Sequence, residues 1–252
     1  DQPKTFPDFR KMLDDMDRGI DAVVIATPDH THAVIAAGAI RAGKHVFCEK
    51  PLTRTVHESR ALRELAREYK VATQMGNQGM ASSEFRRTVE LIWNGGLGTV
   101  REAHVWNGAG GSGLRQPPSE QQPVPDGFHW DLWLGPAASR PYHRDWTHRH
   151  LWREFGTCQL GNWGSHSAAL AFLALKVDTL WYDAAAGPIR VQATVPDVLR
   201  INFPQWEIVH YHLPARGDLP PVRLTWYNGG GAVKDIFPTM ERLMGPPAAP
   251  GE

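Results

Sequence analysis

Short apolar runs alternate with amphipathic segments over the first third of the chain. Residues 20–28 form a continuous apolar run closed by a proline, which is the pattern of a parallel strand covered on both faces. Further strands are predicted over 44–49 and 71–77, and helices with one apolar face over 6–16, 31–43 and 55–70. Strands and helices that alternate at this short spacing predict a doubly wound parallel sheet of the Rossmann type.

The pattern changes near residue 97. A helix is predicted to begin with Ser83 as its N-cap and to end at Gly95 and Gly96. Beyond it, apolar and polar residues alternate, which predicts a largely antiparallel sheet with one covered face over 99–106, 190–195, 206–214 and 222–229. The expected class is α/β, with a partial doubly wound domain over 1–97 and an α+β domain over 98–252. Both ends read as incomplete, because the chain opens on a helix that should follow a strand and closes while the second sheet is still forming.

Composition limits the possible partners. Lys and Arg together equal Asp and Glu at 27 each, so no long-range field attracts nucleic acid or an anionic membrane surface. No apolar run approaches the roughly 18 residues that a membrane span requires, and a small-molecule partner is expected. Two cysteines are too few for a disulfide framework. The compartment stays open: cytoplasmic by default, with periplasmic export as the alternative because the first residues form neither a start nor a signal peptide.

One glycine motif is rejected because of its context. Gly108, Gly110 and Gly113 satisfy the G-x-G-x-x-G spacing of a dinucleotide-binding turn and follow a predicted strand. That turn works because its last glycine opens a helix whose N-terminus binds the pyrophosphate. Four prolines between 117 and 125 forbid such a helix. The segment is interpreted as a flexible loop, with a lid over substrate as the functional alternative.

Three ordered segments carry a resemblance to a known family. Residues 26–32 read ATPDHTH, residues 42–51 read AGKHVFCEKP, and residues 161–166 read GNWGSH. In order and separation they resemble the signatures of the Gfo/Idh/MocA oxidoreductases, named for glucose-fructose oxidoreductase, inositol dehydrogenase and the rhizopine-catabolism protein. The resemblance covers residue 1 to about residue 175 and is looser beyond.

The resemblance implies a site at the carboxyl ends of the parallel strands, where open sheets bind ligands. It makes 1–97 a partial dinucleotide-binding domain and 98–252 a substrate-binding and oligomerisation domain that is incomplete at its C-terminus. The pyrophosphate-binding turn is expected upstream of Asp1, so the chain as given is expected to bind the cofactor weakly. NAD or NADP is the implied cofactor, with contacts from Thr27, Pro28, Asp29, His32, Glu49, Lys50, Pro51, Asn77 and Gln78.

Structural alternatives accompany these assignments. For Thr27, Pro28, Asp29 and His32, the alternative to cofactor binding is helix capping by Thr31 and Asp29. The Lys50–Pro51 bond is expected to be cis, as is frequent in the family.

Three His-x-His pairs suggest metal binding, but no cysteine or clustered carboxylate completes a ligand set, so no metal is expected. Aromatic residues interleave with His and Arg over 130–153, which suits a sugar ring or a clasp that packs the domains together. The candidate substrate contacts are Tyr142, Arg153 and Trp163.

Lys50, Asn162 and His166 are the implied catalytic residues. Asn162 and His166 lie four positions apart in a helix predicted over 161–175, so both project from one face, and the nearby helix N-terminus disfavours an imidazolium. A neutral His166 is expected to take the carbinol proton while Lys50 holds the developing oxyanion. Asn162 stands where many relatives have Asp and is expected only to orient substrate. The alternative is a capping Asn162 and a histidine satisfied in the core.

The sequence therefore predicts an NAD(P)-dependent oxidoreductase that transfers a hydride between a sugar or polyol carbinol and nicotinamide. One alternative is a glycoside hydrolase that retains its NAD and cleaves by oxidation, elimination and re-reduction. Another is a non-catalytic ligand-binding protein on the same fold. By resemblance, the open face of the second sheet is expected to form a homodimer or homotetramer, with large apolar residues marking the interface.

Overall fold

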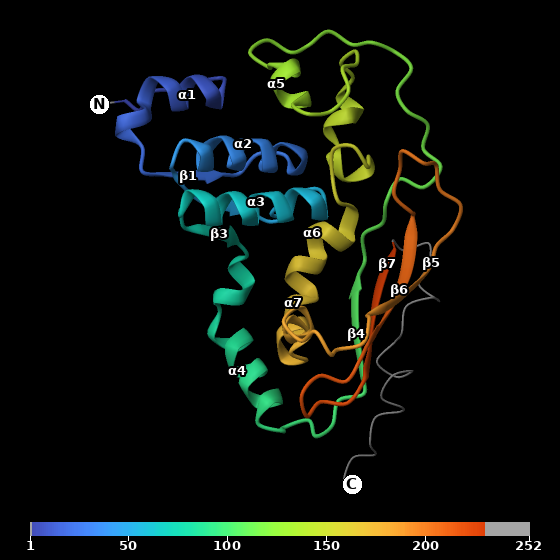
Figure 1. The fold of residues 1–252 in the computed structure, drawn as a ribbon. Coiled ribbons are helices and arrows are strands. Elements are labelled where there is room, and N and C mark those ends of the chain that lie inside the picture. The colour runs from blue at the N-terminus through green and yellow to red at the C-terminus, as the bar shows by residue number, and fades with distance from the viewer. Residues whose placement is uncertain (1, 230–252) are drawn as a thin grey trace.

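The computed structural model describes residues 2–229, which form two sheets flanked by helices (Figure 1). The first sheet is parallel, with its strands in the order β1 (Ala22–Ile25), β2 (His45–Glu49) and β3 (Thr73–Gly76). The strands alternate along the chain with α1 (Phe9–Met16), α2 (Asp29–Arg41) and α3 (Val56–Tyr69). The predicted parallel, Rossmann-like arrangement is confirmed.

All three helices pack on the same face of the parallel sheet. Their shared core joins strand and helix side chains, among them Val23, Ile25, Cys48 and Leu62. The opposite face is open in the described part of the chain, and Val24 on it is 73% exposed. The prediction that residues 20–28 form a strand covered on both faces is therefore wrong for this part. An apolar run records hydrophobicity but does not record which helices lie against it.

The helix ends follow their capping residues. Thr55 Oγ1 accepts from the N–H of Glu58 at 3.2 Å, and the Glu58 carboxylate accepts from the N–H of Thr55 at 2.7 Å, so a capping box begins α3. Ser82, and not the predicted Ser83, caps α4 (Ser83–Trp93) by accepting from the N–H of Phe85. Adjacent serines are equally good caps, so the sequence alone does not choose between them.

Lys70, at the C-terminus of α3, is a position where glycine is expected to stabilise the protein. Its backbone is left-handed, with φ 54°, and the residue is exposed. A side chain with a Cβ costs roughly 1–2 kcal/mol in this region, whereas glycine adopts it freely. Lys70→Gly is therefore expected to raise the free energy of unfolding in urea by about 1 kcal/mol. The matched control is Glu68→Gly, which lies inside α3 and should lower that free energy by about 1 kcal/mol; a loss of stability in both variants would contradict this expectation.

The second sheet is mixed. Its strands lie in the order β4 (Glu102–Asn107), β7 (Val222–Gly229), β6 (Trp206–Leu213) and β5 (Arg190–Thr194). β5, β6 and β7 are antiparallel, as predicted, whereas β4 runs parallel to β7. The difference arises because alternation along a strand specifies which side chains face the core and does not specify the direction of the neighbouring strand.

Helices α4, α6 (Cys158–Ser167) and α7 (Ala169–Ala174) lie beside this sheet, and α5 (Trp130–Leu134) lies beyond them (Figure 1). Two helices thus replace the single one expected over 161–175. The core between α7 and the sheet includes Leu175, Val177, Leu213 and Leu224. Short 3-10 helices occur over 17–19, 78–81, 144–147, 149–151 and 177–181. None of the helices in the described residues has the length and apolar character that crossing a bilayer requires.

The glycine-rich loop that begins at residue 108 is anchored to the second domain. The N–H of Gly113 donates to the carbonyl of Phe203 at 2.9 Å, and the buried amide of Asn202 donates back to the carbonyl of Gly113 at 2.9 Å. The next helix in the chain is α5, so Gly113 does not open a helix, in line with the rejection of the dinucleotide motif. These bonds tie the start of the loop to a segment some ninety residues away, which local composition does not reveal, and the flexibility of the loop stays a prediction.

The face of the second sheet that points away from α7 is rich in polar side chains. The strand register places His104, Thr225 and His210 side by side on β4, β7 and β6. His104 Nδ1 lies 3.0 Å from the hydroxyl of Tyr227, and His210 Nδ1 lies 3.0 Å from Thr225 Oγ1. The same register places Trp106, which is 46% exposed, on this face, and assembly into a dimer or tetramer stays a prediction.

Candidate active site

The carboxyl ends of the three parallel strands meet α6 of the second domain. Glu49 ends β2, Gly76 ends β3, and Thr27 lies two residues beyond the end of β1. Open parallel sheets bind ligands at such strand ends. The peptide bond between Lys50 and Pro51 is cis, as predicted. Residues from both domains therefore meet at this edge of the sheet.

Lys50 extends from the end of β2 to α6. Its Nζ donates to the main-chain carbonyl of Asn162 at 3.1 Å and also to the side-chain Oδ1 of the same residue. The ring centroid of Trp163 lies 5.7 Å from Nζ. Two acceptors and an aromatic face hold the ammonium group in place at the junction between the domains.

Asn162 and His166 lie one turn apart on α6, as their spacing predicts. The helix begins at Cys158 after the N-cap Thr157, so Asn162 does not cap it, and His166 lies in its last turn. The prediction that a nearby helix N-terminus disfavours the imidazolium is therefore wrong. The ring of His166 lies 5.8 Å from that of Trp163, centroid to centroid. Gly161 permits the close packing at the start of this helix, because a Cβ there would lie 2.3 Å from the Cβ of Thr157. The structure thus brings Lys50, Asn162 and His166 together.

Lys50 and His166 both have lowered pKa values. Burial is the main cause for Lys50, and the charge of Arg149 acts in the same direction. Burial also lowers the pKa of His166, and the charge of Lys50 adds to that effect. A lowered pKa keeps the imidazole neutral near pH 7, and the neutral ring is the form that accepts a proton.

His32 is buried and positions the strand ends. Its two ring nitrogens lie 2.7 Å from the carbonyl oxygens of Pro51 and Thr27. Thr31 donates its hydroxyl to Thr27 Oγ1 and to the carbonyl of Pro28, each at 2.8 Å, and no side chain caps the N-terminus of α2. The histidine therefore ties the segment after β1 to the segment that follows Lys50.

Asp29 lies in a buried contact between the two domains. Its carboxylate accepts from Arg149 Nε at 3.0 Å and from Thr157 Oγ1 at 3.2 Å. His150 Nδ1 lies 3.8 Å away, and burial lowers the pKa of that histidine. The sequence did not predict these partners, which follow Asp29 by more than a hundred residues. The only hint of these partners in the sequence is the basic segment HRH at 148–150. The sequence alone does not show which acidic residue this segment contacts.

The other predicted site residues lie in three different settings. Trp163 is 47% exposed beside Lys50, at the edge of the junction. Tyr142 is buried and packs against Phe128 and Trp130, with ring centroids 5.8 and 5.2 Å away. Gln78 is exposed at the start of a 3-10 helix. Only Trp163 of these contacts the catalytic candidates.

Arg153 also lies outside the junction. Its Nε donates to the carbonyl of Asn202, and its guanidinium lies 5.3 Å from the ring centroid of Phe203. The carbonyl of Arg153 accepts from Arg54 of the first domain at 3.0 Å. The described contacts of its side chain thus lie within the second domain, and only its main-chain carbonyl joins the two domains.

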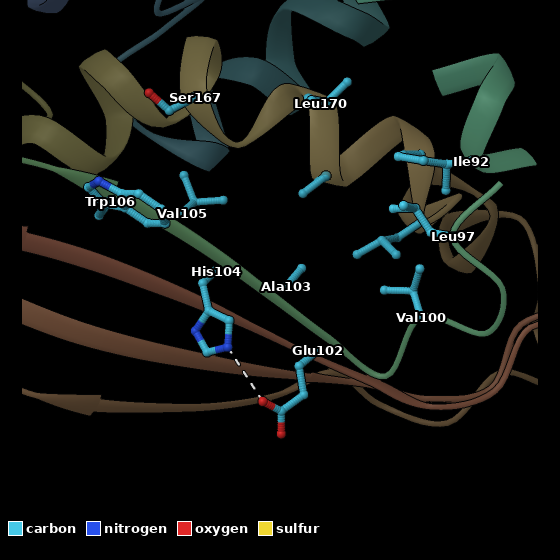
Figure 2. A pocket seen from close by; sticks show the side chains of 13 residues that line it. Ile92, Leu97, Val100, Glu102, Ala103, His104, Val105, Trp106, Ser167 and Leu170 are labelled. Carbon is cyan, nitrogen blue, oxygen red and sulfur yellow. Dashed lines mark ion pairs between the residues drawn. The ribbon is translucent and has the colours of Figure 1, made fainter. Parts of the chain in front are cut away.

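An apolar cavity of about 400 Å³ lies between α4, α7 and β4 (Figure 2). Its walls are mostly aliphatic and include Ile92, Leu97, Val100 and Leu170. The nearest titratable pair, Glu102 and His104, has its atoms 3.4 Å apart and points away from the aliphatic side chains in Figure 2. The cavity supplies no converging acid and base, so the candidate site remains the junction at Lys50.

Comparison with known proteins gives two family matches. A model described as an oxidoreductase family with an NAD-binding Rossmann fold matches residues 2–77, and a model described as the C-terminal alpha/beta domain of the oxidoreductase family matches residues 106–211. Between them they cover more than half of the chain. The chain belongs to the Gfo/Idh/MocA oxidoreductase family. Its two sheets correspond to the two domains that these models describe.

Curated relatives of this Gfo/Idh/MocA chain align over shorter stretches. Levoglucosan dehydrogenase of Pseudarthrobacter phenanthrenivorans is 43% identical over 81 residues, which is 32% of this chain and 19% of that protein. The scyllo-inositol 2-dehydrogenase (NAD(+)) of Bacillus subtilis is 47% identical over 60 residues, 24% of this chain and 18% of that protein. These alignments concern a minor part of each relative.

Solved structures share the fold. An inositol dehydrogenase homolog from Azotobacter vinelandii, complexed with NAD+, has a TM-score of 0.64 at 20% identity and is covered to 51%, whereas 91% of this chain is covered. The chain thus spans about half the length of the solved structures it matches. At this level of identity the likeness concerns the fold alone.

The family of this chain is NAD-binding, and the strand ends offer one free acceptor to such a cofactor. Asn77 donates to the carbonyl of Ser165 at 2.6 Å, while its buried Oδ1 has no hydrogen-bond partner among the described residues. That oxygen is a free acceptor for an amide or a hydroxyl donor. Gly76 makes room for the Glu49 carboxylate beside Asn77, because a Cβ at this glycine would lie 2.7 Å from that carboxylate.

Proposed function

We propose that the protein is an NAD-dependent dehydrogenase that oxidises a carbinol of a sugar or polyol to a carbonyl, and that it runs the reverse reduction as well. The observation that carries this proposal is the contact of Lys50 with Asn162, on the helix that also carries His166. A cation and a neutral base beside the strand ends are the two groups that a carbinol oxygen needs during oxidation.

Two electrons and two hydrogens leave the carbinol in this reaction. The carbon loses a hydride, and NAD, when bound, would supply the acceptor for it. The oxygen loses a proton, which the neutral ring of His166 takes. The ammonium of Lys50 stabilises the negative charge that develops on that oxygen, and its lowered pKa reflects the partly dehydrated setting in which this stabilisation is strong.

Asn162 and Trp163 position these groups. Asn162 is neutral, so it accepts a hydrogen bond from Lys50 without raising the basicity of His166 as a carboxylate would. Trp163 presents an exposed indole beside Lys50, and such a face stacks against the C–H surface of a ring. A cyclic polyol or a pyranose therefore suits the junction better than a short linear alcohol does.

The test is an assay for net cofactor reduction. The full-length protein that contains this chain is purified and incubated with NAD+ or NADP+ and, separately, with levoglucosan, scyllo-inositol, myo-inositol and simple hexoses, and NADH or NADPH formation is followed by absorbance. Reduction of NAD+ that depends on one of the cyclic polyols supports the proposal. Release of an aglycone from a nitrophenyl glycoside without net NADH would instead support the hydrolase that retains its cofactor, and no turnover with any compound would contradict the dehydrogenase.

A further inference from the structure

A second cavity, of about 340 Å³, lies at the contact between the two domains. Its polar wall consists of four arginines and one glutamate: Arg54, Arg140, Arg153, Arg200 and Glu154. Four positive groups against one negative group leave a formal charge of +3 around a space large enough for a small organic molecule. None of the catalytic candidates lines this cavity, so it is separate from the junction at Lys50.

The single carboxylate of the cavity, that of Glu154, already has partners within the protein. Glu154 forms an ion pair with Arg140 and accepts from the N–H of Ala138 at 2.9 Å. Arg140 in turn lies over the rings of Trp146 and Phe155, at 4.8 and 5.0 Å from their centroids. The charges of these two residues cancel, so the excess positive charge belongs to the other three arginines.

None of these three arginines pairs with a carboxylate among the described residues. Arg54 and Arg153 donate only to main-chain carbonyls, and Arg200 makes no described hydrogen bond. Arg54 donates one nitrogen to the carbonyl of Arg153 at 3.0 Å, while its buried Nε has no partner among the described residues. Arg153 donates Nε to the carbonyl of Asn202. Arg200 is exposed and makes no hydrogen bond or ion pair within the described part of the chain. Arg54 and Arg153 are each held by one hydrogen bond and keep further N–H donors, and a guanidinium with free donors matches the two oxygens of a carboxylate or phosphate.

The remaining walls are apolar and consist of two tryptophans and Ile201. Trp146 and Trp152 are buried and line the same space, with ring centroids 4.8 Å apart. Rigid indole walls exclude water and strengthen the attraction between a guanidinium and an anion. Since Arg54 comes from the first domain and the others from the second, an anion bound here contacts both domains.

We propose that this cavity is a binding site for a small molecule that carries an oxyanion, either a carboxylate or a phosphate, and that the bound anion bridges the two domains. The site does not depend on the dehydrogenase activity, because it uses none of the residues Lys50, Asn162 and His166. Carboxylates and phosphates share one property: each presents at least two oxygens that accept hydrogen bonds from several guanidinium N–H groups at once.

The experiment is calorimetric titration of the purified protein with inorganic phosphate and, separately, with benzoate. Saturable binding of phosphate alone assigns the site to phosphates, of benzoate alone to carboxylates, and of both to oxyanions in general. Arg200→Ala is expected to weaken that binding about tenfold or more, the effect of one lost charge-assisted hydrogen bond. Because Arg200 has no described partner, this substitution is expected to leave the fold intact.

The matched control is Arg41→Ala, an exposed arginine at the end of α2 whose removal changes the net charge by the same amount. It is expected to bind the probe as the unmodified protein does. Bound phosphate or benzoate should also raise the melting temperature of the unmodified protein, and less so that of Arg200→Ala. Absence of saturable binding of both probes, or equal affinities of Arg200→Ala and Arg41→Ala, would overturn the proposal.

Discussion

His166→Ala is expected to lower kcat/KM for polyol oxidation by roughly 10²- to 10⁴-fold, the range for loss of a general base. The neutral imidazole is the proposed proton acceptor beside Lys50. Without it, only water remains to take the carbinol proton. The pH profile gives a second readout. Burial and the charge of Lys50 lower the pKa of His166 below its usual 6.5, so the unmodified enzyme should keep its activity down to that lowered pKa and lose it only at more acid pH.

This loss of activity at acid pH, the acid limb of the profile, should be missing in His166→Ala, because the variant has no imidazole to protonate. His57→Ala is the matched control, since His57 is exposed on α3 and makes no described hydrogen bond. It should retain both full turnover and the acid limb. An unchanged pH profile in His166→Ala would remove this residue from the reaction, whatever the size of the loss in turnover.

Lys50→Ala is expected to lower kcat/KM by roughly 10²- to 10³-fold, as when one donor to a developing oxyanion is removed. Nζ is held by the side chain and carbonyl of Asn162 before substrate arrives, so little reorganisation is needed at the moment of reaction. Loss of the ammonium leaves the charge on the carbinol oxygen without its nearest cation. Substrate affinity should change less than turnover, because the neutral carbinol gains less from the cation than the oxyanion does.

Two comparisons separate this role from a structural one. Lys11→Ala removes an exposed lysine of α1 that makes no described hydrogen bond, and it should leave the kinetics unchanged. Added methylammonium should restore part of the turnover of Lys50→Ala, since a small cation fits the space of the missing side chain. If Lys50→Ala alters only the apparent substrate affinity, the lysine binds substrate without acting on the transition state.

The sequence predicted the parts of this site that depend on local order. Glu49, Lys50 and Pro51 follow an apolar run that was identified as a strand, which places them at a strand end. Asn162 and His166 are four residues apart, and that spacing alone puts them on one helical face. The capping residue Thr55 and the C-terminal Gly43, with φ 72°, likewise follow from residue type.

The parts that the sequence did not predict depend on contacts between distant segments. Asp29 pairs with Arg149 across 120 positions, and no local pattern marks either residue as the partner of the other. Arg153 was predicted to bind substrate because it lies in a segment rich in aromatic and basic residues, whereas the structure places its side chain against Asn202 and Phe203. The coverage of a single face of the first sheet and the parallel pairing of β4 are also set by tertiary packing, which periodicity does not encode.

Backbone conformation adds one feature that composition hides. Cys158 begins α6 with φ 53°, a left-handed conformation that favours glycine. Its thiol is buried, and that burial raises its pKa to about 12, so the group stays protonated and acts as a small apolar side chain. The cysteine therefore contributes packing at the start of the helix that carries Asn162 and His166.

The central claim is that Lys50 and His166 act on the same oxygen in one transition state. The most direct measurement is kcat/KM of the double variant Lys50→Ala/His166→Ala beside the two single variants, on one polyol and at one pH. Groups that act as a unit give losses that do not multiply. The expected result is a double variant about as slow as the slower single variant. A loss equal to the product of the two single losses would show that the residues act independently and would contradict the mechanism.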